Sequence, residues 1–175
     1  MPPISKANLP YYKDLSERIE WEGGRPYWKA HIRLRGSLAG HFDGKYRRIT
    51  CRLEGTTRLI YAHVLKWFMD TGELPSHYLD HIDHNGDNNA GTNIRECTQK
   101  ENNRNRRSFS GSSSQYKGVS WDRNCWRSSI WDGKRNVTLG RFDCEESAAR
   151  AYDSASRALH GEFSFTNFPE EHNAF

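Results

Sequence analysis

The spacing of apolar residues in the first half of the chain predicts a β-hairpin followed by a helix. Polar and apolar residues alternate over Tyr46 to Cys51 and again over Thr57 to Tyr61, with Glu54-Gly55 between them, which is the pattern of two half-buried strands joined by a tight turn. The period then changes to that of a helix over Ala62 to Asp70, whose apolar face carries Ala62, Leu65, Phe68 and Met69. Thr71-Gly72 supplies the stop signal for this helix.

A unit of strand, turn, strand and helix is predicted next along the chain. A short alternation over Tyr78 to Asp83 is followed by the turn-forming residues HNGDNN and by a second strand candidate over Asn93 to Cys97. Thr98 is a good N-cap, and Glu101, three residues later, completes a capping box. We therefore expect a helix that starts at Gln99 and runs to Arg107.

The last third of the chain predicts a three-stranded antiparallel sheet covered by one helix. Residues 108–114, SFSGSSS, are rich in serine and glycine and indicate a flexible linker. Three strand candidates follow, Lys117 to Trp121, Cys125 to Trp131 and Arg135 to Phe142. A long helix should begin at the start signal of Asp143 and Glu146 and end before Gly161, and its apolar face carries Ala148, Tyr152, Ala155 and Leu159.

The composition fits an α+β protein built from two small modules. The chain has 175 residues, with 26 basic against 22 acidic side chains and a formal net charge of +4, which permits a polyanionic partner without demanding one. Its four cysteines are far apart and are interpreted as reduced thiols, and the sequence shows neither a long apolar run nor a signal peptide. We therefore expect a cytoplasmic protein that makes no contact with a membrane.

Local clustering of charge is more informative than the total. The stretch from Gln99 to Arg107 holds a single acidic side chain, Glu101, against four basic ones, Lys100, Arg104, Arg106 and Arg107. Such a run suits a phosphate backbone, and it suits a solvated linker equally well. Both interpretations stay open on the residues alone.

The strand, turn, strand and helix unit contains the residue types that phosphodiester hydrolysis requires. The reaction needs an activated water and a cation that neutralises charge on the phosphate and on the departing 3′ oxygen. Asp80 offers a hard oxygen ligand, His81 a base that titrates near neutral pH, and Asn102 a carbonyl oxygen in the first turn of the predicted helix. Because neighbours on a strand point to opposite faces, Asp80 and His81 can serve one site only where the strand is short and twisted.

The sequence DHIDHNGDNNAGTNIRECTQKENNRNR resembles the core of the HNH endonucleases, the ββα-metal fold of phage and intron-encoded homing enzymes. The resemblance implies that His81 is the general base, that Asn93 fixes the loop and orients the histidine, and that Asp80 and Asn102 are ligands of one divalent cation. Asn102 stands where the family name has its last histidine, which favours Mg²⁺ or Mn²⁺ over zinc. The alternative is an Asx-rich surface turn followed by a polar helix, with no catalytic role.

The resemblance extends upstream through RLIYAHVLKWFMDTGELP, which is similar to the hairpin and helix that precede the core in phage HNH proteins. His63 lies there beside the apolar helix face, so a histidine hydrogen-bonded in the core is favoured over a catalytic one. His84 occupies a turn position where many relatives have glycine, and a turn role is favoured over a phosphate contact. The segment GGRPYWK, within the less readable residues 1–44, is similar to a short Trp-containing hairpin of related phage proteins and should pack against the nuclease core.

The predicted C-terminal sheet leaves one face open for a ligand. Alternation along the middle strand directs Trp126, Ser128 and Ile130 toward the helix and directs Arg127, Ser129 and Trp131 away from it. Val137 and Leu139 of the next strand point inward, so the open face also carries Asn136 and Thr138, with Lys117 and Arg123 near its edge. A small sheet with such side chains can lie in the major groove of duplex DNA. Trp126 is interpreted as a core aromatic and Trp131 as a DNA-facing one.

The stretch from YKGVSW through TLGRFDCEESAARAYDSASRALHGEFSFTNFP strongly resembles the plant ethylene-response-factor (Apetala-two) DNA-binding domain. In that family the sheet enters the major groove through outward arginines and tryptophans. Several of the corresponding positions are Ser120, Ser129, Asn136 and Thr138 here. The resemblance therefore implies the docking face and not the plant recognition sequence.

Together the resemblances imply an HNH endonuclease domain over residues 1–107 with its core at 78–107, a linker over 108–114, and an Apetala-two-type domain over 115–170. We expect a site-specific endonuclease of the phage homing type that acts on double-stranded DNA as a monomer or transient dimer, with one Mg²⁺ (or Mn²⁺) per active site. The expected DNA contacts are Lys100, Arg104, Arg106, Arg107, Lys117, Arg123, Arg127, Ser129, Trp131, Asn136 and Thr138.

Two other functions compete with this expectation. The first is a DNA-binding regulator that retains an inactive HNH scaffold, against which the intact Asp80, His81 and Asn102 argue. The second is a nuclease that acts on RNA or on repair intermediates, against which the resemblance to a domain that reads duplex DNA argues.

Overall fold

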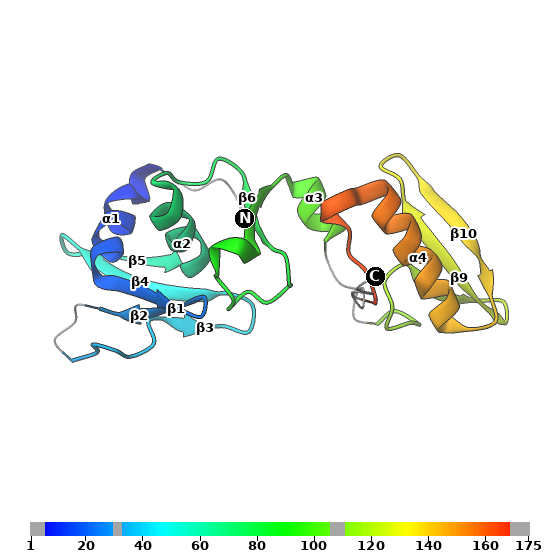
Figure 1. Cartoon of the computed structure of the whole chain (residues 1–175), viewed down its shortest axis with the longest axis horizontal. Helices are drawn as coiled ribbons and strands as arrows, with labels where there is room; N and C mark the ends of the chain where they lie inside the picture. The colour runs from blue at the N-terminus through cyan, green and yellow to red at the C-terminus, as the bar shows by residue number, and fades with distance from the viewer. Residues whose placement is uncertain (1–5, 30–32, 106–110, 169–175) are drawn as a thin grey trace, which may run out of the picture. The chain divides into compact units, whose positions relative to one another are not determined.

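The computed structural model describes residues 6–29, 33–105 and 111–168 and confirms the α+β class, with helices packed on several small antiparallel sheets (Figure 1). The residues group into two compact units, 1–99 and 100–175. Arg106 and Arg107, together with part of the predicted linker, lie outside the described residues. The domain boundary at 108–114 stays a prediction.

In the first unit two helices pack beside a three-stranded antiparallel sheet (Figure 1). The sheet consists of β3 (His41–Phe42), β4 (Arg47–Leu53) and β5 (Thr56–Tyr61). The helices are α1 (Leu9–Arg18), which follows the short turn η1 (Lys6–Asn8), and α2 (Ala62–Thr71). Their shared core is apolar and fully buried, and its central side chains are Leu15, Ile49, Ile60, Val64 and Leu65.

The predicted hairpin and helix are confirmed, and so are the turn at Glu54-Gly55 and the helix stop at Gly72. Glu54 and Gly55 both adopt left-handed φ values, 49° and 78°, as a two-residue hairpin turn requires. The helix α2 ends at Gly72, whose φ is 79° and whose N–H donates to the carbonyl of Phe68 at 2.8 Å. A second hairpin, formed by β1 (Ile19–Glu22) and β2 (Arg25–Trp28), confirms the short Trp-containing hairpin.

The candidate core is a two-stranded ribbon made of β6 (Tyr78–His81) and β7 (Ile94–Cys97). Its second strand starts one residue later than predicted because Asn93 closes the turn η2 (Gly91–Asn93). The helix α3 (Gln99–Arg104) follows, beginning in the first unit and continuing in the second. The predicted end at Arg107 is wrong, since Asn105 is already a turn. Asparagine is a weak helix former, and three of the residues from 102 to 105 are asparagine.

In the second unit one helix covers a three-stranded antiparallel sheet with the order β10–β9–β8 (Figure 1). The strands are β8 (Val119–Asp122), β9 (Cys125–Trp131) and β10 (Asn136–Phe142). The prediction that the first strand begins at Lys117 is wrong because Gly118 adopts a φ of 77° and lies against the Tyr152 ring. A Cβ at Gly118 would come within 1.9 Å of that ring.

The helix α4 (Glu145–His160), followed by the turn η3 (Gly161–Phe163), corrects two details of the prediction. Its N-cap is Cys144 and not Asp143. Leu159 is 49 % exposed, while the buried face consists of Ala148, Ala149, Tyr152, Asp153 and Ser156. Asp153 can be buried because its carboxylate accepts hydrogen bonds from the N–H groups of Asn167 at 2.8 Å and Phe168 at 2.9 Å.

None of the helices within the described residues is both long and apolar enough to cross a membrane.

Candidate functional site

The loop between β6 and β7 is held by its own polar side chains. The Asn93 carbonyl oxygen accepts from the N–H of Asp83 at 3.0 Å, and the Asn93 amide donates to the Asp83 carboxylate and to the Asn88 carbonyl, both at 2.8 Å. Although partial burial opposes it, hydrogen bonds from Asn88, from the N–H of Asn85 and from Asn93 hold the pKa of the Asp83 carboxyl below its usual value. The predicted role of Asn93 in fixing the loop therefore has a direct geometric basis.

The same loop is anchored by residues that come before α2 in the sequence. Arg47 and Asp87 form a buried bidentate ion pair, with Nε–Oδ1 at 2.6 Å and Nη2–Oδ2 at 3.0 Å. The N–H of Asn89 donates to the Gly24 carbonyl at 2.8 Å. Gly86 lies so close to the Lys45 carbonyl oxygen that a Cβ would come within 1.8 Å of it. Packing of the GGRPYWK segment against the core is thus confirmed.

His81 is buried at the end of β6 and is oriented by Asn89. The Nε2 of His81 lies 3.1 Å from the Asn89 Oδ1, and the Asn89 amide nitrogen donates to the Asp87 carbonyl at 3.2 Å. That second bond turns the amide oxygen toward the imidazole, where it can accept a hydrogen from the Nε2. Asn93 is the residue predicted to orient the histidine, but its side-chain hydrogen bonds go to Asp83 and Asn88. Asn89 was missed because a run of three Asp and Asn residues gives no signal of which side chain turns inward.

His63 packs against His81 inside the core of the first unit. The two ring centroids are 5.3 Å apart, and the rings of Tyr46 and Tyr61 lie 5.1 and 5.4 Å from His63. Its burial is as predicted, but within the described residues the Nδ1 has no hydrogen-bond partner. Burial first, and the neighbouring His81 second, lower the pKa of His63 to about 3. The ring beside the candidate base is therefore uncharged at neutral pH.

We expect this buried imidazole to make the fold acid-sensitive. Since its pKa is about 3 when folded and about 6.5 when unfolded, the unfolded chain binds the extra proton as the pH falls from 6.5 toward 3. At pH 4.5 this costs the folded state about 3 kcal/mol. Urea unfolding of the native chain and of His63→Phe at pH 7 and 4.5 measures it, with the exposed His77→Phe as control. Equal pH dependence in the native chain and His63→Phe would contradict the expectation.

Asp80 and His81 are neighbours on β6, a strand of only four residues. Asp80 is buried opposite Arg95, whose Nη2 and Nε lie 3.0 and 3.2 Å from its Oδ2. Arg95 is a further residue that the sequence did not single out. His84 has a φ of 61° and its N–H donates to the His81 carbonyl at 3.1 Å, which is the geometry of the turn position expected for it.

The two predicted metal ligands, Asp80 and Asn102, are both oxygen donors. Among the described residues no three His, Cys, Asp or Glu side chains gather as a metal site. A cation held by Asp80 and the amide oxygen of Asn102 would therefore keep several waters, which is how Mg²⁺ is commonly bound. Asn102 is half-buried on α3, in the part of the helix that belongs to the second unit. Its pairing with Asp80 stays a prediction.

The open face of the second sheet carries the predicted side chains in cross-strand pairs. Trp131 lies opposite Asn136, and Ser129 lies opposite Thr138. Trp131 is 54 % exposed, whereas Ser128 and Ile130 are buried beneath the helix and Trp126 packs on the core. Arg123, with a φ of 50°, is exposed in the turn between β8 and β9. Trp121, which shares the inward phase with Trp126, is half exposed.

Arg141 also lies on this face, although strict alternation along β10 does not predict it there. A bulge between Thr138 and Gly140 shifts the phase of β10, so Arg141 lies directly opposite Arg127. The two guanidinium groups share Asp122, with Arg141 at 2.9 Å and Arg127 at 3.9 Å. Without the bulge Arg141 would point toward the helix.

Three of the predicted phosphate contacts gather in the second unit. The Lys117 ammonium donates to the Arg104 carbonyl. Burial, followed by the charges of Arg104, Lys117 and Lys100, lowers the pKa of His160 against a backbone hydrogen bond that raises it. The structure thus brings the basic residues of α3 together with the basic residue that precedes β8.

Two family models match the chain, an HNH endonuclease model over residues 60–104 and an AP2 domain model over residues 114–162. The protein is therefore an HNH endonuclease domain joined to an AP2 (Apetala-two) domain, and both matches support DNA as its partner.

Similar proteins come from phage, virus and plant. Protein 3.8 of Escherichia phage T7 is 36 % identical over 105 residues, which is 58 % of this chain and 85 % of the phage protein. An uncharacterized HNH endonuclease of Acanthamoeba polyphaga mimivirus is 33 % identical over 112 residues, 63 % of this chain and 55 % of the viral protein. An AP2-like ethylene-responsive transcription factor of Arabidopsis thaliana is 45 % identical over 65 residues, 36 % of this chain and 13 % of the plant protein. The chain belongs to the same family as protein 3.8 of phage T7, and it also matches the HNH endonuclease and AP2 domain models.

Proposed function

We propose that the chain is a site-specific endonuclease that hydrolyses phosphodiester bonds of double-stranded DNA with one Mg²⁺ or Mn²⁺ per active site. The observation that carries the proposal is the buried His81, oriented by Asn89 at 3.1 Å and adjacent in sequence to the buried Asp80. A homing-type role in a host cytoplasm is part of the proposal, and it is supported by the resemblance of the core sequence to phage homing enzymes.

Each residue of the site has a separate task in this proposal. A cation held by Asp80 and Asn102 would neutralise charge on the phosphate and on the leaving oxygen. His81 accepts the proton of the attacking water, while Asn89 orients its imidazole ring. Arg95 keeps the Asp80 side chain in place through its Oδ2. The neutral ring of His63 packs against His81 without adding a positive charge that would oppose proton uptake.

The second unit selects the DNA in this proposal. Trp131, Asn136, Ser129 and Thr138 read base edges from the open sheet face, and Arg127 and Arg123 support them. Lys100, Arg104 and Lys117 contact phosphates, and Arg106 and Arg107 extend that contact. Because one HNH unit holds one cation, a single encounter cuts one strand, and a double-strand break requires two copies side by side or in succession.

The test is cleavage of supercoiled plasmid with Mg²⁺ and with excess chelator. We expect open-circular product to appear before linear product and to be absent when the metal is chelated. Linear product without an open-circular intermediate would contradict the single-strand cut. An inactive chain across many DNAs and several divalent metals would contradict the nuclease proposal and favour a DNA-binding regulator.

A further inference from the structure

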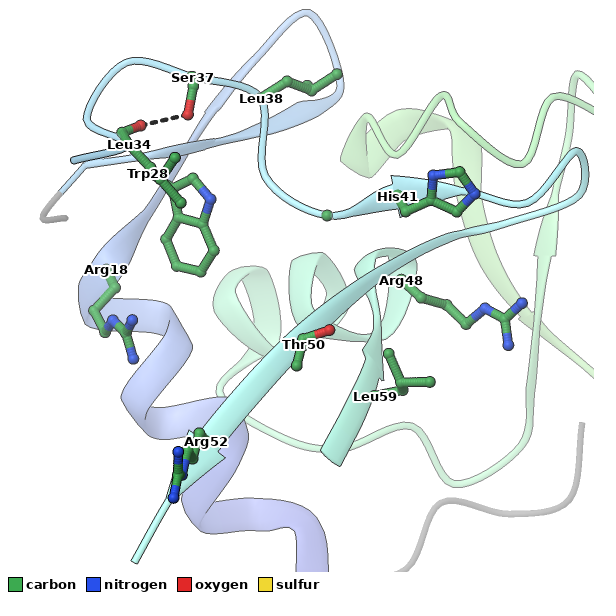
Figure 2. A pocket seen from close by; sticks show the side chains of 11 residues that line it. Arg18, Trp28, Leu34, Ser37, Leu38, His41, Arg48, Thr50, Arg52 and Leu59 are labelled. Atoms are coloured by element: carbon green, nitrogen blue, oxygen red, sulfur yellow. Dashed lines mark hydrogen bonds between the residues drawn. The ribbon is translucent and has the colours of Figure 1, made fainter. Parts of the chain in front are cut away.

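A cavity of about 680 Å³ lies on the open face of the β3–β4–β5 sheet (Figure 2). Its wall is formed by outward side chains of β4 and β5, by the end of α1 and by the segment after β2. Neither Asp80 nor His81 lines it. The structure therefore has a second concave surface that the nuclease proposal does not use, here called the sheet groove.

The lining of the sheet groove is basic. It contains three arginines and a histidine, Arg18, Arg48, Arg52 and His41, and no acidic side chain. Arg18 and Arg52 lie at one end and Arg48 and His41 at the other (Figure 2). Arg18 pairs with Asp14 and Arg48 with Asp43, both outside the lining, and Arg52 has no partner among the described residues. A lining of this charge is complementary to an anion with several phosphates.

The lining of the sheet groove also contains exposed apolar side chains. Leu34, Leu38 and Leu59 are 42, 38 and 59 % exposed, and all three line the groove. Thr50 lies directly across the strand pair from Leu59. Apolar side chains gathered at one exposed site indicate a surface that is covered in a complex. In a DNA strand each phosphate is next to a deoxyribose, which offers apolar contact. Such a strand therefore matches both the basic and the apolar side chains of the lining.

The spacing and position of the cations suit a strand that reaches the candidate site. Arg48 and Arg52 are four residues apart on β4, or about 13 Å along the strand, so the two side chains can contact different phosphates of one DNA strand. The Arg48 guanidinium lies 6.0 Å from the Tyr61 ring, and Tyr61 packs on His63 at 5.4 Å, next to His81. The Arg48 end of the groove is thus connected to the candidate base through packed rings.

We propose that the sheet groove binds the sugar-phosphate backbone of the DNA beside the bond to be cut. The proposal rests on the nuclease function proposed above and gives its first unit a DNA contact independent of the AP2 sheet. The groove holds the strand by charge and sugar packing and does not select sequence.

The test is the affinity of the full chain for a labelled random-sequence duplex, measured by fluorescence anisotropy in chelator across a salt series. We expect Arg52→Gln to weaken binding several-fold and to reduce the slope of log affinity against log salt by about one. Leu59→Glu places a negative charge in the lining of the groove, so it should weaken DNA binding about tenfold. Arg58→Gln is the matched control, because Arg58 is exposed on β5 opposite buried Cys51 and does not line the groove.

The outcomes separate this proposal from the nuclease proposal. Weaker binding by Arg52→Gln and Leu59→Glu, with native binding by Arg58→Gln and unchanged thermal melts in all three, supports the groove. Native affinity and salt slope in both groove variants overturn it, and so does an equal loss in Arg58→Gln, which would show a general charge effect. Plasmid nicking by the native chain in Mg²⁺ is scored independently, so the nuclease proposal can stand or fall alone.

Discussion

Replacing His81 with alanine should lower the rate of plasmid nicking by about a hundredfold to ten-thousandfold, the usual contribution of a positioned general base. Alanine removes the ring nitrogen that accepts the proton of the attacking water, and it leaves Asp80 and the DNA-reading sheet unchanged. The measurement is the single-turnover conversion of supercoiled to open-circular plasmid in Mg²⁺. DNA affinity in chelator should stay at the native value, because the loss lies in the chemical step.

Two further variants distinguish a base from a structural histidine. His77→Ala is the matched control, since His77 is exposed four residues earlier and its Nδ1 lies 2.9 Å from the Ser76 hydroxyl; it should nick at the native rate. Asn89→Ala removes the bond that orients His81, so it should lower the rate less than His81→Ala and shift the pH profile of nicking. A native rate in His81→Ala would eliminate the mechanism.

Loss of either oxygen ligand should abolish most of the metal-dependent rate. We expect Asp80→Asn and Asn102→Ala each to lower nicking by about a hundredfold and to raise the Mg²⁺ concentration needed for half-maximal rate, since the cation supplies several kcal/mol of charge stabilisation. Asparagine replaces Asp80 because its amide oxygen can still accept a hydrogen bond from Arg95, whereas alanine offers no acceptor. The measurement is a Mg²⁺ titration of the nicking rate.

Asn103→Ala is the matched control for the helix position, because Asn103 is the exposed neighbour of Asn102 on α3. It should keep the native Mg²⁺ dependence. An unchanged titration in Asn102→Ala would remove this residue from the metal site and leave Asp80 as the sole protein ligand under test.

Helices and strands with a regular spacing of apolar residues were predictable from the sequence, because that spacing and a turn or stop residue are enough to define them. The hairpin around Glu54-Gly55 is fixed by alternation and by a turn that needs two left-handed residues. α2 ends where Gly72 can adopt such a conformation. The second sheet follows from three alternating segments separated by short turns. In these cases the local preference and the tertiary packing agree.

The contacts that complete the site were not predictable, because they depend on packing between distant segments. Nothing in the spacing of residues indicates that Arg47 pairs with Asp87, forty positions later. The bulge after Thr138 reverses the alternation of side chains along the rest of β10. Arg141 therefore lies on the open face of the sheet, whereas strict alternation would direct it toward the helix. Which asparagine of the HNGDNN turn reaches His81 is decided by the bond from Asn89 to the Asp87 carbonyl.

The contacts that anchor the loop between β6 and β7 decide how the HNH domain can be shortened or grafted onto another protein. The family match begins at residue 60, yet Gly24, Lys45 and Arg47, which clasp the loop, all precede it. A fragment limited to the matched residues 60–104 would lack Arg47 and would leave Asp87 without its ion-pair partner. Transferring the candidate active site to another DNA-binding protein therefore means carrying residues 9–104 together, because α1 contributes Leu15 to the same core.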